Sequence, residues 1–563
     1  MRLVLALLGA VLLAIFATTP PGPRGSDTPA TEFSAVRAMA DVRAIARAPH
    51  PTGSAEDAHV RDVLTTRLRA IGLEVSTAQG SMDAKSAERL ATWSGSTATV
   101  PLTNIIARLP GTDPTLPAVL LMAHHDTVWG SPGAADDSAG VVSILETVRA
   151  LKASGPQRRD VIVLLTDGEE LGLSGAKMFF AGDPLRAHIG PIVNLETRGG
   201  GGRASMFETG DGNDAAVRLF AGAVRRPVGT SLSVFVYKKL PNSTDFTPAK
   251  AAGHYGYNFA FVGRPGLYHS PLATPDNLDQ GALQDMGGQV LDLTRALAAA
   301  PVDPVAKIDR VFFDIFGLFV VHYPPVFGWV LLGAAALAWG FAARGAGTWR
   351  DGVRGIAVTL LLPIVAGVLL YAINLVSGAD GPVNYYDRLA AIPRLQVQAL
   401  LACIASIGLV RALLMRHRLD PAGWTGAAVP LLLLAAVAQG LAPTAAFLIT
   451  VPLLIGGVVA LLSERGVLAD SIAVVLAAIG IGHLLAIGFL LMQAVGPGMP
   501  MIAALPLVLA ATIAWPLAPI VSRQTALTAA LLLIVAALAV ALWVRLDPVA
   551  ASVAVYSKFG APH

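Results

Sequence analysis

A series of long apolar stretches beginning after residue 310 constrains this chain of 563 residues more than any other property. About 20 apolar residues span the hydrocarbon core of a bilayer as a helix, and most of these stretches reach or approach that length. The sequence therefore predicts an all-α, multi-span transmembrane domain at residues 311–546, followed by a tail at 547–563. About eight helices are expected, near residues 326–343, 355–376, 395–415, 425–441, 444–462, 471–493, 500–518 and 525–544.

Another apolar run, Leu3 to Phe16, follows Arg2 and precedes the helix breakers at Pro20–Pro23. Segment 1–24 is either a cleaved signal peptide or a transmembrane anchor, and the lack of a clear small-x-small cleavage site favours an anchor. If the N-terminus is cytoplasmic, the positive-inside rule is satisfied by the arginines of alternate loops. These are Arg344, Arg350, Arg354, Arg416, Arg418, Arg465 and Arg523. Residues 31–300 would then face the periplasm of a bacterial inner membrane, or a lumen in a eukaryote.

Residues 31–300 have the pattern of a globular α/β domain. Short apolar runs typical of buried strands alternate with segments of helical periodicity, which indicates a mostly parallel mixed sheet flanked by helices. Strands are expected at 118–123, 161–165 and 258–262, and helices at 138–152, 174–181, 213–224 and 277–299. Ser54 followed by Asp57 marks the start of an earlier helix that ends before Gly72.

Overall composition excludes some classes of protein. The net charge is only +3, so a nucleic-acid partner is not expected. Apolar residues make up 54% of the chain and mean hydropathy is +0.61, which makes the lipid bilayer the expected surroundings of its C-terminal part. The single cysteine, Cys403, lies in an apolar run and permits no intrachain disulfide. The oligomeric state is unknown at this level.

Polar residues follow the predicted strands in a pattern that suits a metal site. His124 follows the 118–123 strand, and Asp126 can accept a hydrogen bond from the second nitrogen of its ring. Asp136 lies in a small-residue turn before a helix, where one carboxylate can bridge two cations. Its neighbour Asp137 is better explained as the cap of that helix. The chain from Thr166 to Gly175 carries the adjacent acids Glu169 and Glu170.

Two adjacent glutamates repel each other unless a cation holds one of them. One carboxylate can then bind metal while the other accepts a proton from water. Taken alone, the pair would be a solvated acidic turn, and Glu196 and His269 alone would be structural residues. Together these imidazoles and carboxylates, without a thiolate, suit a pair of zinc ions around a shared carboxylate.

The order of these motifs resembles the M28 (aminopeptidase Y-like) zinc metallopeptidases. Residues 33–54 and the motifs Pro241–Phe246 and Phe312–Asp314 are similar to the membrane branch of that family, the endoplasmic reticulum metallopeptidase 1 and vacuolar membrane protease type. The resemblance implies an aminopeptidase-type exopeptidase that acts on a peptide substrate through metal-activated water. It also implies two zinc ions per chain. Their ligands would be His124 and Glu196 for one ion, Glu170 and His269 for the other, and Asp136 between them, with Glu169 as general base and Asp126 orienting His124.

Two other functions fit parts of the pattern. A glutaminyl cyclase-like acyltransferase shares the acidic loop but uses one zinc ion. A membrane transporter or scaffold with a docking domain would not need all of these residues, and a transporter should carry acidic residues within its spans, where this sequence has almost none.

Overall fold

The computed structural model describes residues 1–343, 347–381, 385–414 and 420–547. The described chain divides into two compact units, of which one comprises residues 19–322 and the other residues 1–18 together with residues 323–547. The predicted tail lies outside the described residues apart from Asp547. Arg344, Arg416 and Arg418, which entered the prediction of orientation, also lie outside them.

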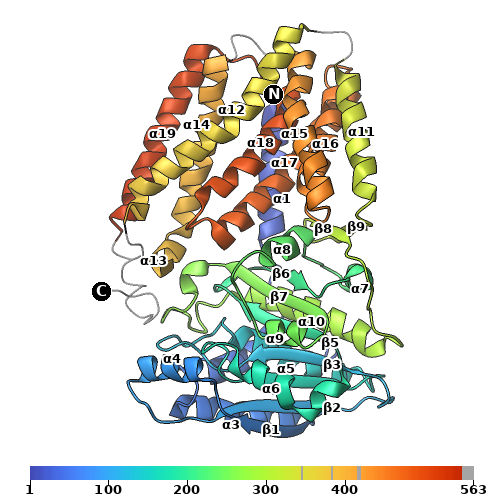
Figure 1. The fold of residues 1–563 in the computed structure, drawn as a ribbon, viewed down its shortest axis with the longest axis vertical. Helices are drawn as coiled ribbons and strands as arrows, with labels where there is room; N and C mark the ends of the chain where they lie inside the picture. The colour runs from blue at the N-terminus through green and yellow to red at the C-terminus, as the bar shows by residue number, and fades with distance from the viewer. Residues whose placement is uncertain (344–346, 382–384, 415–419, 548–563) are drawn as a thin grey trace. The chain divides into compact units, whose positions relative to one another are not determined.

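The 19–322 unit is built on a seven-stranded mixed sheet with strand order β1-β2-β4-β3-β5-β7-β6 (Figure 1). The four central strands, β4, β3, β5 and β7, run parallel, and the outer strands β1, β2 and β6 are antiparallel to their neighbours. The strands are β1 (Glu74–Gly80), β2 (Leu102–Leu109), β3 (Ala118–His124), β4 (Val161–Thr166), β5 (Ile189–Thr197), β6 (Gly201–Thr209) and β7 (Gly256–Gly263). The predicted α/β class with a mixed sheet is confirmed.

Helices cover both faces of this sheet, because β3, β4 and β5 are buried along their whole length and must be shielded on two sides. The larger core cluster joins one face to α2 (Ala35–Ile45), α3 (Ala55–Ile71), α5 (Ser138–Ala153), α7 (Asp214–Ala223) and α10 (Gln280–Ala299). A smaller cluster joins the other face to α6 (Ser174–Gly182) and α9 (Phe246–Ala251). The helices and strands expected from periodicity are all present.

Local sequence explains where the helices next to the site begin. The side chain of Ser54 accepts a hydrogen bond from the backbone of Asp57 and starts α3, and Gly72 ends that helix in a left-handed conformation. Asp137 caps α5 by accepting from the backbone of Gly140, as predicted. Periodicity did not reveal the shorter elements α4 (Ala84–Ser94), α8 (Ser231–Tyr237), β8 (Val311–Ile315) and β9 (Phe319–Tyr323).

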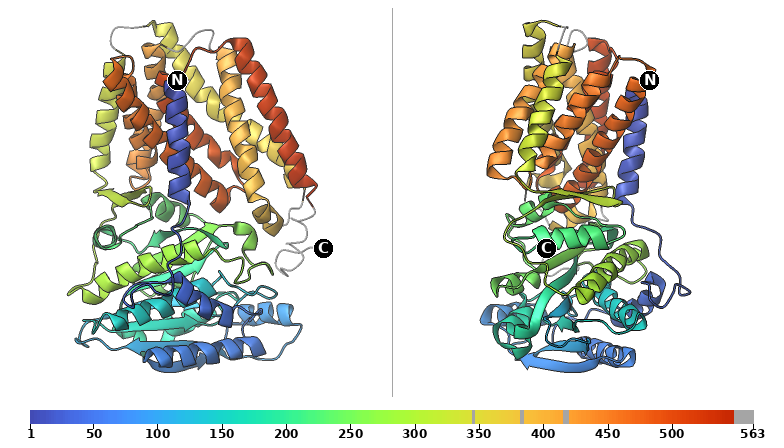
Figure 2. Two further views of the ribbon diagram at one scale, coloured as in Figure 1. Left: turned by 180° about the vertical axis from the view of Figure 1, so that it is seen from behind. Right: turned by 90° about the vertical axis from the view of Figure 1, so that its right-hand side faces the viewer.

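The other unit is a bundle of apolar helices (Figure 2). Within the described residues, six helical segments are long and apolar enough to cross a membrane: Trp349–Ala379, Ile392–Leu414, Pro421–Leu441, Val467–Val495, Pro500–Leu517 and Arg523–Arg545. Three shorter apolar helices, α1 (Arg2–Thr18), α11 (Phe327–Ala342) and α16 (Phe447–Leu462), complete the set predicted from the sequence. This is the architecture of a multi-pass integral membrane protein.

Small residues bring α1 close to α17 (Val467–Val495). A Cβ atom placed on Gly9 would lie 3.1 Å from the Cβ of Ala478, and one on Gly482 would lie 2.9 Å from the backbone oxygen of Ala10. Such close approach is how transmembrane helices associate without a hydrophobic driving force. At one end of the pair, the Arg2 guanidinium lies 2.9 Å from the Asp470 carboxylate.

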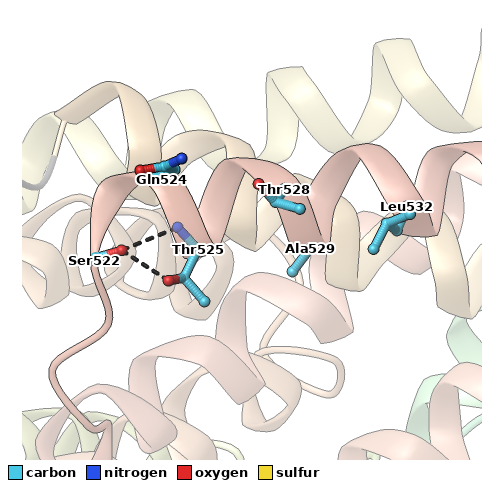
Figure 3. Close-up of a pocket in the computed structure, with 6 residues that line it drawn as sticks. All are labelled: Ser522, Gln524, Thr525, Thr528, Ala529 and Leu532. Carbon is cyan, nitrogen blue, oxygen red and sulfur yellow. Dashed lines mark hydrogen bonds between the residues drawn. The ribbon is translucent and has the colours of Figure 1, made fainter.

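A hollow lies along the first turns of α19 (Arg523–Arg545) and is shown in Figure 3. Ser522 accepts a 3.0 Å hydrogen bond from the backbone of Thr525, so this hydroxyl serves as the helix cap. The residues around the hollow are Ser522, Gln524, Thr525, Thr528, Ala529 and Leu532, and none of them is titratable. The groups of side chains that could hold a metal ion, among the described residues, all lie in the 19–322 unit.

Candidate metal-dependent active site

The candidate site residues gather at the carboxyl ends of the parallel strands. His124 is the last residue of β3, Glu196 is the next to last residue of β5, and Glu169 and Glu170 follow the end of β4. Parallel strands place these ends at one edge of the sheet, where α/β folds bind their ligands. His269 reaches the same place from the loop before α10, with a positive φ of 53°.

The carboxylate of Asp136 lies between two imidazoles. Its Oδ1 is 3.2 Å from Nε2 of His124, and its Oδ2 is 3.2 Å from Nε2 of His269. The pKa of Asp136 is lowered, because hydrogen bonds from His124 and His269 outweigh the effect of burial, which alone would raise it. Each oxygen of this carboxylate therefore faces a different nitrogen ligand.

Two groups of potential ligands share Asp136. One contains His124, Asp136 and Glu196, the other contains Asp136, Glu170 and His269, and within each group the ligand atoms lie within 4.8 Å of one another. In the second group, Oε1 of Glu170 is 3.0 Å from Nε2 of His269. The structure thus brings together all five residues that the sequence predicted as metal ligands.

Glu169 lies beside this pair of groups. It forms a third group with His124 and Glu170, again with ligand atoms within 4.8 Å. Burial raises the pKa of Glu169 well above its ordinary value, and the neighbouring Glu170 raises it further. The pKa of Glu196 is raised for the same reason, first by burial and then by Glu169. Such a concentration of carboxylates at one buried edge is typical of a cation site.

Asp126 makes a different set of contacts from the one expected. Its backbone oxygen lies 2.9 Å from Nδ1 of His124, whereas its carboxylate Oδ1 is 3.5 Å from that nitrogen. The two carboxylate oxygens instead accept hydrogen bonds from the backbone N–H groups of Glu169, at 3.0 Å, and Glu170, at 3.3 Å. Asp126 therefore positions both the imidazole of His124 and the loop that carries the two glutamates.

Three other residues near the site are now explained. Arg203 follows the glycine-rich turn after β5 and lies in β6, where it is buried and forms a 2.6 Å ion pair with Asp285, so this arginine belongs to the core. Asp245 is buried and accepts a hydrogen bond from the hydroxyl of Thr166 at the end of β4. Burial raises the pKa of Asp245 to about 6. His125, the neighbour of His124, contacts Asp57 on α3.

The donor set fits zinc. Imidazole nitrogens and carboxylate oxygens are its usual ligands outside cysteine sites, and the two groups offer both kinds. Oxygen Oε1 of Glu196 is buried and has no hydrogen-bond donor among the described residues, as expected for an atom that binds a cation. Buried carboxylates in such numbers are costly without positive charge, which two divalent ions would supply.

Residues 104–294 match the model of peptidase family M28, so the chain contains an M28 peptidase domain. Human endoplasmic reticulum metallopeptidase 1 is 31% identical over 238 residues, which cover 41% of this chain and 26% of that protein. A vacuolar membrane protease of Lachancea thermotolerans is 30% identical over 296 residues, covering 50% of this chain and 30% of that protein.

The chain thus spans about a quarter to a third of the length of these curated relatives. Among solved structures, a zinc aminopeptidase from Bacillus subtilis is similar over 50% of this chain and 99% of its own, with a TM-score of 0.37 and 15% identity. The family assignment depends on the sequence match and agrees with the site geometry.

Proposed function

We propose that this protein is a membrane-anchored zinc metallopeptidase with two metal ions per chain. His124 and Glu196 would hold one ion, Glu170 and His269 the other, and Asp136 both. The observation that carries the proposal is the position of the Asp136 carboxylate, with one oxygen 3.2 Å from each of two histidines. A site for one ion would not need a carboxylate shared between two complete ligand groups.

When bound, the zinc ions would polarise the scissile carbonyl and activate the attacking water. Glu169 is the general base: it accepts the proton of that water and passes it to the leaving amine. Asp126 fixes the loop through the backbone N–H of Glu169, so the carboxylate of the base is kept beside the ligand groups.

The M28 domain makes peptides the proposed substrates and an aminopeptidase-type exopeptidase the proposed mode of action. The proposed location is an inner membrane with the 19–322 unit on the periplasmic side, or on the lumenal side in a eukaryote. The ion pair between Arg2 and Asp470 supports this topology, because it holds the N-terminus at the same end of the bundle as the loop that contains Arg465. The 19–322 unit follows the other end of α1.

Purified full-length protein should release free amino acids from aminoacyl and dipeptide substrates and contain two zinc ions per chain. Glu169→Gln should abolish most of this activity while keeping the zinc. A peptide with N-terminal glutamine distinguishes a peptidase from a glutaminyl cyclase. The cyclase would convert the glutamine to pyroglutamate and release no amino acid. Cyclisation with one zinc ion per chain would contradict the peptidase proposal.

A further inference from the structure

Behind the candidate site lies a second layer of polar residues that the proposed mechanism does not use. Residues 50–57 run alongside residues 124–127, and hydrogen bonds join the two segments. The backbone N–H of His50 donates to the hydroxyl of Thr127 at 3.0 Å, and that of Thr127 donates to the backbone oxygen of His50 at 3.3 Å. The hydroxyl of Thr52 donates to the carboxylate of Asp126 at 3.4 Å.

His125 lies at the centre of this layer. Because side chains alternate along a strand, His124 points into the candidate site and His125 points to the opposite side. Its Nδ1 is 3.1 Å from Oδ1 of Asp57, and its Nε2 is 3.1 Å from the backbone oxygen of Thr103 on β2. The ring is fully buried and is therefore fixed on both sides.

The same ring connects the two loops that carry site residues. Asp167 begins the loop with Glu169 and Glu170, and its ligand atom lies within 4.8 Å of those of Asp57 and His125. Oxygen Oδ2 of Asp167 accepts a 2.8 Å hydrogen bond from the backbone of Thr103. A displacement of His125 would therefore affect both the end of β3 and the loop after β4.

Asp57 is itself held firmly. It accepts a 3.1 Å hydrogen bond from the backbone of Gly53 and forms an ion pair with Arg61 one turn along α3. Arg61 also lies 4.0 Å from the carboxylate of Asp167. The positive charge of Arg61 offsets the two buried carboxylates of this trio.

We propose that Asp57 and His125 are positioning residues, which hold the end of β3 and the acidic loop so that His124, Glu169 and Glu170 face the metal ions. This inference rests on the proposed zinc peptidase function. Partners of this type that lie behind a ligand typically change metal affinity or activity by about 10- to 100-fold when they are replaced. Neither residue touches substrate or metal in this arrangement.

The test compares Asp57→Asn with Asp285→Asn in the full-length protein. Asp285 also belongs to a buried ion pair of the same unit, with Arg203, and its other hydrogen bond comes from the backbone of Ala204. Its variant therefore controls for a general loss of stability. Zinc affinity is measured by competition with a chelator, kcat and KM with a dipeptide, and folding by the thermal midpoint of the zinc-free protein.

Asp57→Asn should lower zinc affinity about 10-fold or more. Its kcat should fall by a larger factor than the change in its KM. Asp285→Asn should lower the thermal midpoint. It should leave zinc affinity within about twofold of wild type, since Asp57 and His125 still hold the ligand groups. If Asp57→Asn fails to fold, His125→Gln serves in its place, because it removes the contact with Asp57 from the other side of the pair. Its zinc affinity should fall in the same direction.

Equal zinc affinity in Asp57→Asn and Asp285→Asn would overturn the inference. A third zinc ion per chain that disappears in Asp57→Asn would also overturn it, because Asp57, His125 and Asp167 would then be ligands. These results are distinct from a failure of the proposed function itself, in which wild-type protein would bind no zinc and cleave no peptide.

Discussion

Nε2 of His269 lies 3.2 Å from Oδ2 of Asp136, although the two residues come from loops at opposite ends of the M28 match. The other oxygen of the same carboxylate faces His124. A shared carboxylate makes the two ligand groups dependent on one side chain, and this dependence can be measured.

Asp136→Asn should reduce zinc binding at both ligand groups, because an amide offers one weak oxygen ligand where the carboxylate offers two. We expect less than one tightly bound zinc ion per chain and a loss of activity of about 100-fold or more. Asp137→Asn is the matched control. Asn is as good a helix cap as Asp, so this neighbouring variant should keep both zinc ions and its stability. Loss of only one zinc ion in Asp136→Asn would contradict a shared ligand.

Glu169→Gln should lower kcat/KM by about 100- to 10,000-fold, the usual contribution of a general base. The amide retains the size of the side chain but cannot accept the proton. Zinc content and the thermal midpoint should stay close to wild type, since Glu169 is not assigned as a ligand. Elemental analysis alongside steady-state kinetics distinguishes this result from loss of metal. Near-normal activity in this variant would show that another group is the base.

Removal of zinc should destabilise the 19–322 unit. Buried carboxylates that repel each other lose their compensating charge, and binding to the folded state contributes about 2.7 kcal/mol when free zinc is 100 times its Kd. Thermal unfolding with and without a chelator measures the difference, and added zinc should restore both the midpoint and activity. If the chelator changes neither, the ligand groups do not hold a metal in solution.

Asp160, which lies outside the candidate site, makes a pH-dependent contribution to the stability of the folded state. Burial alone would raise its pKa, but hydrogen bonds from the backbone of Gly111 and from Arg108 lower it below the ordinary value of 3.8. A lowered carboxyl pKa stabilises the folded state above pH 3.8, and this contribution disappears as the pH falls through the folded pKa.

Asp160→Asn should therefore lower the free energy of unfolding by about 1.5–3 kcal/mol at pH 7, the usual value of hydrogen bonds to a charged group. The cost should shrink as the pH is lowered towards 3.8 and below. The comparison is made on zinc-free wild type and variant, so that loss of metal at low pH does not contribute. Asp113→Asn, at a more exposed acid of the preceding loop, should show little cost at either pH. A cost that is the same at both pH values would contradict the ionic explanation.

The sequence was informative where one strong pattern decided the structure. Buried parallel strands are apolar throughout, so β3 and β4 could be recognised from their apolar runs. The acids that follow these strands were therefore expected at one edge of the sheet. The antiparallel strand β1 is largely exposed along its length and has no such pattern. Its position follows from pairing with β2, a contact that periodicity does not encode.

The same limit applies within the site. The five proposed ligand positions could be predicted because family motifs point to all of them. Strand ends point in addition to His124, Glu170 and Glu196. The hydrogen bonds of Asp126 to the backbone of Glu169 and Glu170 depend on how two loops meet in space. The contact of His125 with Asp57 joins α3 to β3 and likewise has no local signal. The alternation of side chains along an extended chain indicates only that His125 and His124 point to opposite sides.

The packing of α1 predicts that residues 2–18 stay in the mature protein as part of the bundle. Gly482 has no room for a side chain, since a Cβ atom would lie 2.9 Å from the backbone oxygen of Ala10. Gly488 on the same helix is the matched control, because a Cβ atom there would meet Pro506 at an ordinary 3.7 Å. Gly482→Ala should lower the thermal midpoint of the detergent-solubilised protein, whereas Gly488→Ala should leave it unchanged or raise it.

An epitope tag placed before Arg2 should remain on the full-length protein in membranes, where N-terminal sequencing and immunoblotting can detect it. The ion pair of Arg2 with Asp470 allows a second test. Asp470→Asn should weaken the attachment of α1 to the bundle without altering zinc content. Complete removal of the tag from active protein would mean that the segment is a cleaved signal. The close packing of Gly9 and Ala10 on α17 would then have no role in the working enzyme.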